Sequence, residues 1–129
     1  MIAILTLTAA LLGQDPARSP ATAPETVVAV KSALDDGLVD YPSARFRDVR
    51  LVTRPSNTFV TLAVCGEYNS RTRDGGYSGW TRFVLLNDRL SRGEGNALER
   101  RGWQVWCEGA DVVILDPDIT TAVSPSAQE

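Results

Sequence analysis

The polar stretch at residues 66–80 lies between two apolar runs and carries side chains that could bind a ligand. Arginines beside consecutive glycines can bind an anion, with backbone N–H groups completing the site. Aromatic side chains can form a platform for a carbohydrate or for a protein partner. The simpler alternative is a loop whose asparagine and glycines only set its shape, with the aromatic residues packing across the strands. The candidate ligand-binding residues are Glu67, Asn69, Arg71, Arg73, Tyr77 and Trp80.

Catalytic chemistry is restricted because the chain contains no histidine. This removes the usual general base for a serine or cysteine nucleophile and the commonest transition-metal ligand. A pair of carboxyl groups could still hydrolyse a glycoside if the two lay about 5–10 Å apart and one had a raised pKa. The carboxyl groups considered for this role are Glu67, Asp74, Glu108 and Asp111.

Oxygen ligands for calcium are also present in the polar stretch. However, the spacing of Glu67, Asn69 and Asp74 does not fit an EF-hand loop, and arginines lie among them. We therefore predict no metal site, no cofactor and no enzymatic activity.

The two cysteines, Cys65 and Cys107, are too few for a four-thiolate zinc site. They could form a buried reduced pair, but a disulfide suits an exported protein better. Such a bond would close a loop of about 40 residues and add on the order of 3–4 kcal/mol of stability. We predict a structural disulfide.

The amino-terminal residues 1–12 form an uncharged apolar run that ends at Gly13. The run resembles the hydrophobic region of a secretory signal and is too short to span a bilayer. A buried helix or strand at the start of the domain is the alternative. We predict a signal peptide at 1–13, a linker at 14–21, one domain at 22–118 and a flexible tail at 119–129, with the mature protein periplasmic or secreted.

An amphipathic helix is predicted after the linker. Residues 22–25 have the form of a capping box, and Val27, Val30, Leu34 and Leu38 recur at spacings that place them on one helix face. Gly37 suits the left-handed residue that often follows a helix.

The remaining apolar runs predict strands. Residues 46–51 read as an edge or half-exposed strand, and residues 58–65 and 80–86 as a central hairpin with a long, ordered loop. Residues 103–107 read as a further strand and residues 112–115 as a short buried one. The predicted fold is α+β, with one N-terminal helix packed on a four- to five-stranded antiparallel sheet.

A family resemblance rests on residues 65–69, Cys-Gly-Glu-Tyr-Asn, and residues 75–80, Gly-Gly-Tyr-Ser-Gly-Trp. This segment resembles one found in small exported proteobacterial proteins of unknown function. The upstream turn at residues 40–46 is similar to theirs, whereas Tyr68 replaces their usual valine. The resemblance implies export and a small α+β domain, and it implies no activity.

These observations favour an exported, non-enzymatic binding or envelope-associated module. Its partner would be a protein or a cell-envelope component. A nucleic-acid partner is disfavoured by the net charge of -3 and the pI near 4.9, and no membrane span is expected after signal removal. A small carboxylate-dependent hydrolase acting on envelope glycans is the alternative, and a purely structural envelope protein is a third possibility.

Overall fold

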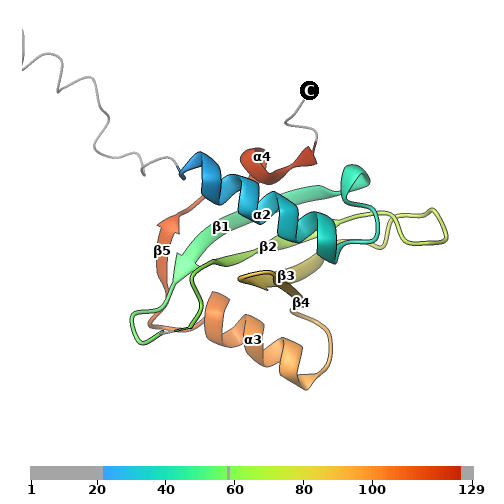
Figure 1. Ribbon diagram of the computed structural model, residues 1–129. Helices are drawn as coiled ribbons and strands as arrows, with labels where there is room; N and C mark the ends of the chain where they lie inside the picture. The colour runs from blue at the N-terminus through green and yellow to red at the C-terminus, as the bar shows by residue number, and fades with distance from the viewer. Residues whose placement is uncertain (1–21, 58, 126–129) are drawn as a thin grey trace, which may run out of the picture.

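The computed structural model describes residues 22–57 and 59–125, which form a five-stranded sheet with helices on both faces (Figure 1). The predicted signal peptide and linker lie outside these residues. All neighbouring strands pair antiparallel, in the order β4-β3-β2-β1-β5. The α+β class with an N-terminal helix on an antiparallel sheet is therefore confirmed. The elements are α2 (Pro24–Gly37), η1 (Tyr41–Ser43), β1 (Arg45–Thr53), β2 (Ala63–Asn69), β3 (Thr81–Leu86), β4 (Arg89–Arg92), α3 (Ala97–Cys107), β5 (Val113–Asp116) and α4 (Thr120–Val123).

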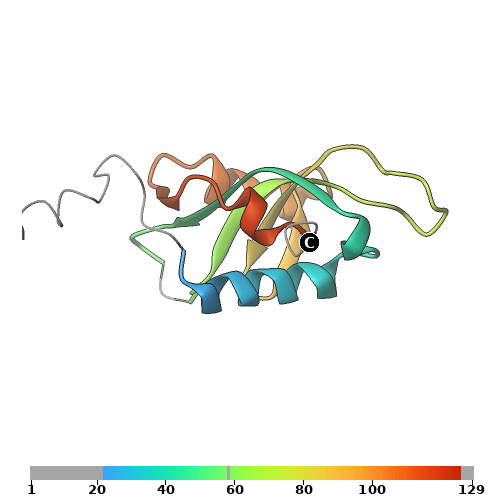
Figure 2. The same cartoon turned by 90° about the horizontal axis from the view of Figure 1, so that it is seen from above.

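The sheet separates two hydrophobic clusters. Helices α2 and α4 lie on one face and α3 lies on the other (Figures 1 and 2). The larger cluster, beneath α2 and α4, is built around Leu34, Val49 and Phe83, all fully buried. The smaller one packs Trp103 and Trp106 of α3 against the opposite face.

Helix α2 forms where the periodicity predicts it, but both predicted ends differ. The N-cap residue is Ala23, whose side chain can accept no hydrogen bond from the backbone N–H groups of the first turn. The Thr22 hydroxyl donates instead to Asp116 at the end of β5, so there is no capping box. Gly37 is the last helical residue and does not adopt a left-handed conformation. Glycine is needed at this position for close packing, because a Cβ atom there would lie 2.9 Å from the Leu90 side chain and would clash with it.

Strand β1 lies between β2 and β5, so it is not an edge strand. A bulge at Asp48, which has a φ of 55°, shifts the register between Arg47 and Arg50. Because of this extra residue, Phe46 and Val49 both pack beneath α2. The predicted half-exposure is correct, since Arg47 on the opposite face is exposed.

The central hairpin is present, although β2 starts later than predicted and runs through residues 66–69. Its strands pair from Ala63 with Leu86 to Tyr68 with Thr81. At Gly66 the neighbouring strands come close, because a Cβ atom would lie 2.9 Å from a Val49 methyl carbon.

The strand predicted at residues 103–107 is wrong, because these residues belong to α3. A capping box between Asn96 and Glu99 starts this helix. Trp103 and Trp106 are three residues apart, a spacing that puts both on one helix face and buries them against the sheet.

Two further predictions near the carboxyl end need correction. Strand β5 is an edge strand whose residues Val113, Ile114 and Leu115 are exposed, so the expected burial at residues 112–115 is wrong. The domain boundary at residue 118 is placed too early, since Ile119 and Val123 are buried in the larger cluster.

The predicted disulfide is confirmed. Cys65 in β2 and Cys107 at the end of α3 are bonded, with their Cα atoms 5.8 Å apart. The bond attaches α3 to the centre of the sheet.

Candidate functional site

Residues 70–80, which connect β2 to β3, form an extended arm that projects beyond the sheet (Figures 1 and 2). A tight turn closes the arm: the Gly75 N–H donates to the Thr72 carbonyl at 3.0 Å, and the Thr72 N–H donates to the Gly76 carbonyl at 2.8 Å. Gly75 has a φ of 92°, as the left-handed position of such a turn requires. Arg71 and Tyr77 pair as an antiparallel bridge, so the hairpin continues into the arm.

The base of the arm is fixed by Asn69. Its side-chain oxygen accepts a hydrogen bond of 3.0 Å from the Gly79 N–H. Gly79 has a positive φ of 92°, which lets the chain turn back towards β3. The amide of Asn69 was predicted to bind a ligand, but its oxygen serves the architecture of the arm.

The short helix η1 holds one side of the arm. The Ser43 hydroxyl accepts a hydrogen bond of 3.1 Å from the Arg71 N–H and donates one of 2.9 Å to the Asp40 carbonyl. The Ser43 carbonyl accepts a 3.1 Å hydrogen bond from the Tyr77 hydroxyl. These bonds join the arm to a segment about 30 residues earlier in the chain and position the side chains of Arg71 and Tyr77.

Arginines lie against the aromatic rings where the arm meets the sheet. The Cζ atoms of Arg45 and Arg71 are 4.7 and 5.7 Å from the centroid of the Tyr77 ring. The Cζ atom of Arg47 is 4.1 Å from the centroid of the Trp80 ring, and Arg47 Nε also donates to Glu67. Both rings are 39% exposed. We call this surface the arginine–aromatic face; it consists of Arg45, Arg47, Glu67, Arg71, Tyr77 and Trp80.

Strand register brings the face together. Arg45 and Arg47 are two residues apart in β1, so their side chains share one side of the sheet. Their partners in β2 are Asn69 and Glu67. Helix α3 packs on the far half of this side, around Cys65, and leaves the arginine–aromatic face uncovered.

The pattern of arginine over aromatic ring continues beneath α3. Trp103 lies between Arg50 and Arg82, whose Cζ atoms are 5.8 and 5.3 Å from its ring centroid. Arg54 lies over Trp106, so each of the three tryptophans has an arginine neighbour. The Trp103 ring is buried, and its Nε1–H has no hydrogen-bond partner among the described residues.

The structure thus unites four of the six predicted ligand-binding residues: Glu67, Arg71, Tyr77 and Trp80. Arg73 lies in the turn of the arm, where it lines a groove together with Arg71. Arg45 and Arg47 were not among the predicted site residues, because Arg45 was assigned to the turn at residues 40–46 and Arg47 to the strand at residues 46–51. Their spacing of two residues was visible in the sequence, but the identity of the strand beside them was not.

Arg73 lines a groove of about 680 Å³ between the arm and the end of α2. Tyr68, Ser70 and Arg92 also line this groove. Burial raises the pKa of the Tyr68 hydroxyl, while the charge of Arg92 acts in the opposite direction.

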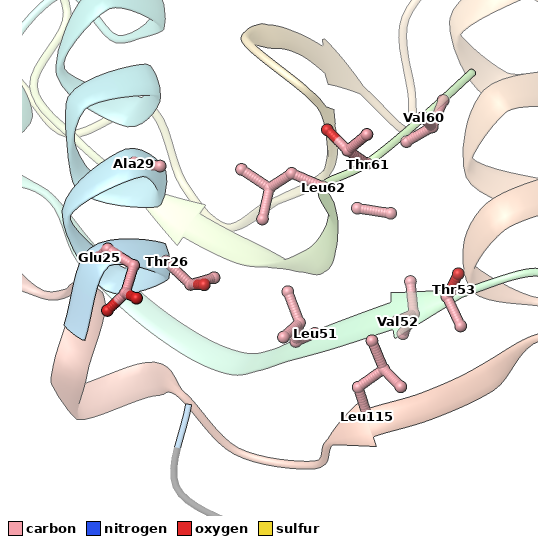
Figure 3. Close-up of a pocket in the computed structure, with 11 residues that line it drawn as sticks. Glu25, Thr26, Ala29, Leu51, Val52, Thr53, Val60, Thr61, Leu62 and Leu115 are labelled. Atoms are coloured by element: carbon pink, nitrogen blue, oxygen red, sulfur yellow. The ribbon is translucent and has the colours of Figure 1, made fainter. Parts of the chain in front are cut away.

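A second cavity, of about 380 Å³, lies at the other end of the sheet, where β1 and the segment before β2 diverge (Figure 3). Leu51 and Leu115 lie on one side of it and Leu62 on the other, with Glu25 of α2 at its rim. None of the predicted site residues lines this cavity.

Three of the four candidate catalytic carboxyl groups lie beside an arginine. Glu67 pairs with Arg47, and an oxygen of Glu108 lies 3.7 Å from a guanidinium nitrogen of Arg82. Hydrogen bonding from the Arg54 guanidinium, together with its charge, lowers the pKa of Asp111. A general acid needs a raised pKa, so the direction of the Asp111 shift is opposite to the one that role requires.

Asp74 lies apart from these groups in the exposed turn of the arm. Within residues 22–57 and 59–125, no three acidic or cysteine side chains come close enough to share a metal ion.

Comparison of the chain with protein-family models, with curated proteins and with solved structures gives no match. Among the helices that the structure describes, none has the length and apolar character needed to cross a membrane.

Proposed function

We propose that this protein is an exported, non-enzymatic binding module that contacts a component of the cell envelope through the arginine–aromatic face. The observation that carries the proposal is the pre-positioning of this face. Its guanidinium groups lie against half-exposed rings, on a part of the sheet that none of the described helices covers. Arginine, tyrosine and tryptophan are the residues that most often dominate binding energy at interfaces.

Rigidity of the face also supports a binding role. Hydrogen bonds from Ser43 and Asn69 hold the arm in place before any partner arrives. A surface that is already ordered loses little conformational entropy on binding, so more of the contact energy contributes to affinity.

Export has its own support. The apolar run at residues 1–12 and the resemblance to small exported proteins point to a periplasmic or secreted location. The disulfide between Cys65 and Cys107 is compatible with an oxidising compartment.

Hydrolysis of envelope glycans is not proposed, because Glu67, Glu108 and Asp111 each lie beside an arginine. The hydrogen bond from Arg54 lowers the pKa of Asp111, whereas a general acid requires a raised pKa.

The binding role can be tested by co-sedimentation of the mature protein with purified envelope fractions. Trp80→Ala should weaken binding by at least about fivefold, the loss expected for an interface residue worth 1 kcal/mol or more. Phe59→Ala is a matched control, since Phe59 is an aromatic residue that is 88% exposed and lies away from the face. Equal binding by the unmodified protein and both variants would contradict the proposal.

A further inference from the structure

We propose that Arg45 and Arg71 act as a clamp for the carboxylate of an acidic sugar unit. This inference rests on the proposed function, because it names the ligand class for the same face. The clamp is built on one ring, since both guanidinium groups lie against Tyr77. Their Cζ atoms lie 4.7 and 5.7 Å from the ring centroid, so both positive charges belong to one patch of the surface around this ring. Both side chains are exposed and can therefore turn towards one bound carboxylate.

Both clamp arginines lack a carboxylate partner among the described residues, although other arginines nearby have one. Arg47 pairs with Glu67, and Arg82 faces two glutamates. A guanidinium has five N–H donors in a planar fork that matches a carboxylate. In the clamp these donors are not used by an internal acid, and the two neighbouring positive charges favour the arrival of an anion.

The clamp is also held in position. Tyr77 is fixed through its hydroxyl to the Ser43 carbonyl, and the backbone of Arg71 is fixed to the Ser43 hydroxyl. Arg45 lies in β1 opposite Asn69, which itself anchors the base of the arm. The backbone and the ring that carry the clamp are therefore in place before an anion arrives.

A sugar acid fits this surface better than a phospholipid headgroup does. The half-exposed Trp80 ring, beside the clamp on the same face, offers an apolar surface for a pyranose ring. Binding to a bilayer surface needs apolar side chains that can enter it, and residues 71–79 contain no aliphatic side chain larger than that of threonine. The exposed residues Ile114 and Leu115 belong to β5, which pairs with the end of β1 furthest from Arg45. The exposed aliphatic residue Val39 lines the groove beside the arm.

The test is a calorimetric titration of the full mature protein with hexagalacturonate at low salt. Saturable binding is expected, and each of Arg45→Gln and Arg71→Gln should weaken it by at least about tenfold, the loss typical of a charge-assisted hydrogen bond. Arg89→Gln is the matched control, because it makes the same change in net charge at an exposed position in β4. Thermal unfolding of each variant establishes that the fold is retained. Arg71→Lys, which keeps the charge without the planar fork, should lose affinity as well.

Two further probes identify the chemistry. The methyl-esterified oligosaccharide should not bind, because it lacks the carboxylate charges. Vesicles containing anionic phospholipid should bind no better than neutral vesicles. No binding of hexagalacturonate, equal binding of its methyl ester, preferential binding to anionic vesicles, or equal losses in all three glutamine variants would each overturn the clamp.

The clamp and the proposed function fail in distinguishable ways. If Trp80→Ala abolishes sedimentation with envelope fractions while Arg45→Gln and Arg71→Gln do not, the binding face stands and the clamp is wrong. If Trp80→Ala has no effect on sedimentation, the proposed function itself is contradicted.

Discussion

Gly66 lies in the middle of β2, where side chains from both neighbouring strands approach it, and its replacement by alanine should destabilise the fold. A Cβ atom there would lie 2.9 Å from Val49 Cγ2, 3.0 Å from Val49 Cα and 3.1 Å from Phe83 Cε1. Val49 and Phe83 are fully buried. Since one of these atoms belongs to the backbone, rotation of a side chain cannot relieve the clash.

The magnitude follows from the cost of overpacking a core, which is typically about 1–3 kcal/mol. We expect the upper part of that range, about 2–3 kcal/mol, because β1 itself must shift away from β2. In a domain of this size the corresponding decrease in Tm is about 10–20 °C.

Two other glycines provide controls that separate crowding from backbone strain. Gly76 has open space around it and no positive φ, so Gly76→Ala should change the free energy of unfolding by less than about 0.5 kcal/mol. Gly75 has open space but a φ of 92°, so Gly75→Ala should destabilise by about 1 kcal/mol through strain alone. Thermal and urea unfolding measure all three. If Gly66→Ala is as stable as the unmodified protein, the described packing of β1, β2 and β3 is refuted.

The remaining predictions concern the disulfide, a buried tyrosine and a helix cap. The native protein should show no reactive thiol, because Cys65 and Cys107 are bonded to each other. Reduction should make both thiols reactive and lower the free energy of unfolding by about 3–4 kcal/mol. Two reactive thiols without reductant would contradict the disulfide. Burial raises the pKa of Tyr41, whose hydroxyl donates to the Val123 carbonyl, from 10.0 to about 12. Its contribution to stability is therefore fully present below pH 10 and is lost as the pH rises towards 12. The free energy of unfolding of Tyr41→Phe should therefore fall less over this pH range than that of the unmodified protein. Asn96→Ala removes the N-cap of α3 and should cost about 1 kcal/mol in urea unfolding, and an unchanged midpoint would mean that the cap is dispensable.

The elements that the sequence predicts well are those with an extended periodic pattern. In α2, Val30 and Leu34 recur at helical spacing, and the apolar strands on either side of the arm define the hairpin. The strand prediction for residues 103–107 is wrong because a run of five residues fits both an alternating strand and one face of a helix. The pair Trp103 and Trp106 belongs to a helix that begins at a capping box seven residues earlier.

Strand order and the complete site depend on contacts between distant residues. The apolar run in β5 was interpreted as buried, but burial depends on the position of a strand in the sheet, and β5 lies at its edge. Part of the candidate site is local to the hairpin, which is why Tyr77 and Trp80 could be selected from the sequence. Arg45 and Ser43 join them only through the pairing of β1 with β2 and the docking of η1.

Binding of an envelope component to the arginine–aromatic face can be measured by NMR of the indole N–H groups in the isotope-labelled protein. The three tryptophans report on different places, since Trp80 is half-exposed on the face whereas Trp103 and Trp106 are buried beneath α3. Comparison with Trp80→Phe assigns the Trp80 signal. On addition of a solubilised envelope polysaccharide, we expect a saturable shift of the Trp80 signal, with the signals of Trp103 and Trp106 unchanged. An unmoved Trp80 signal, while backbone signals elsewhere shift, would contradict binding at this face.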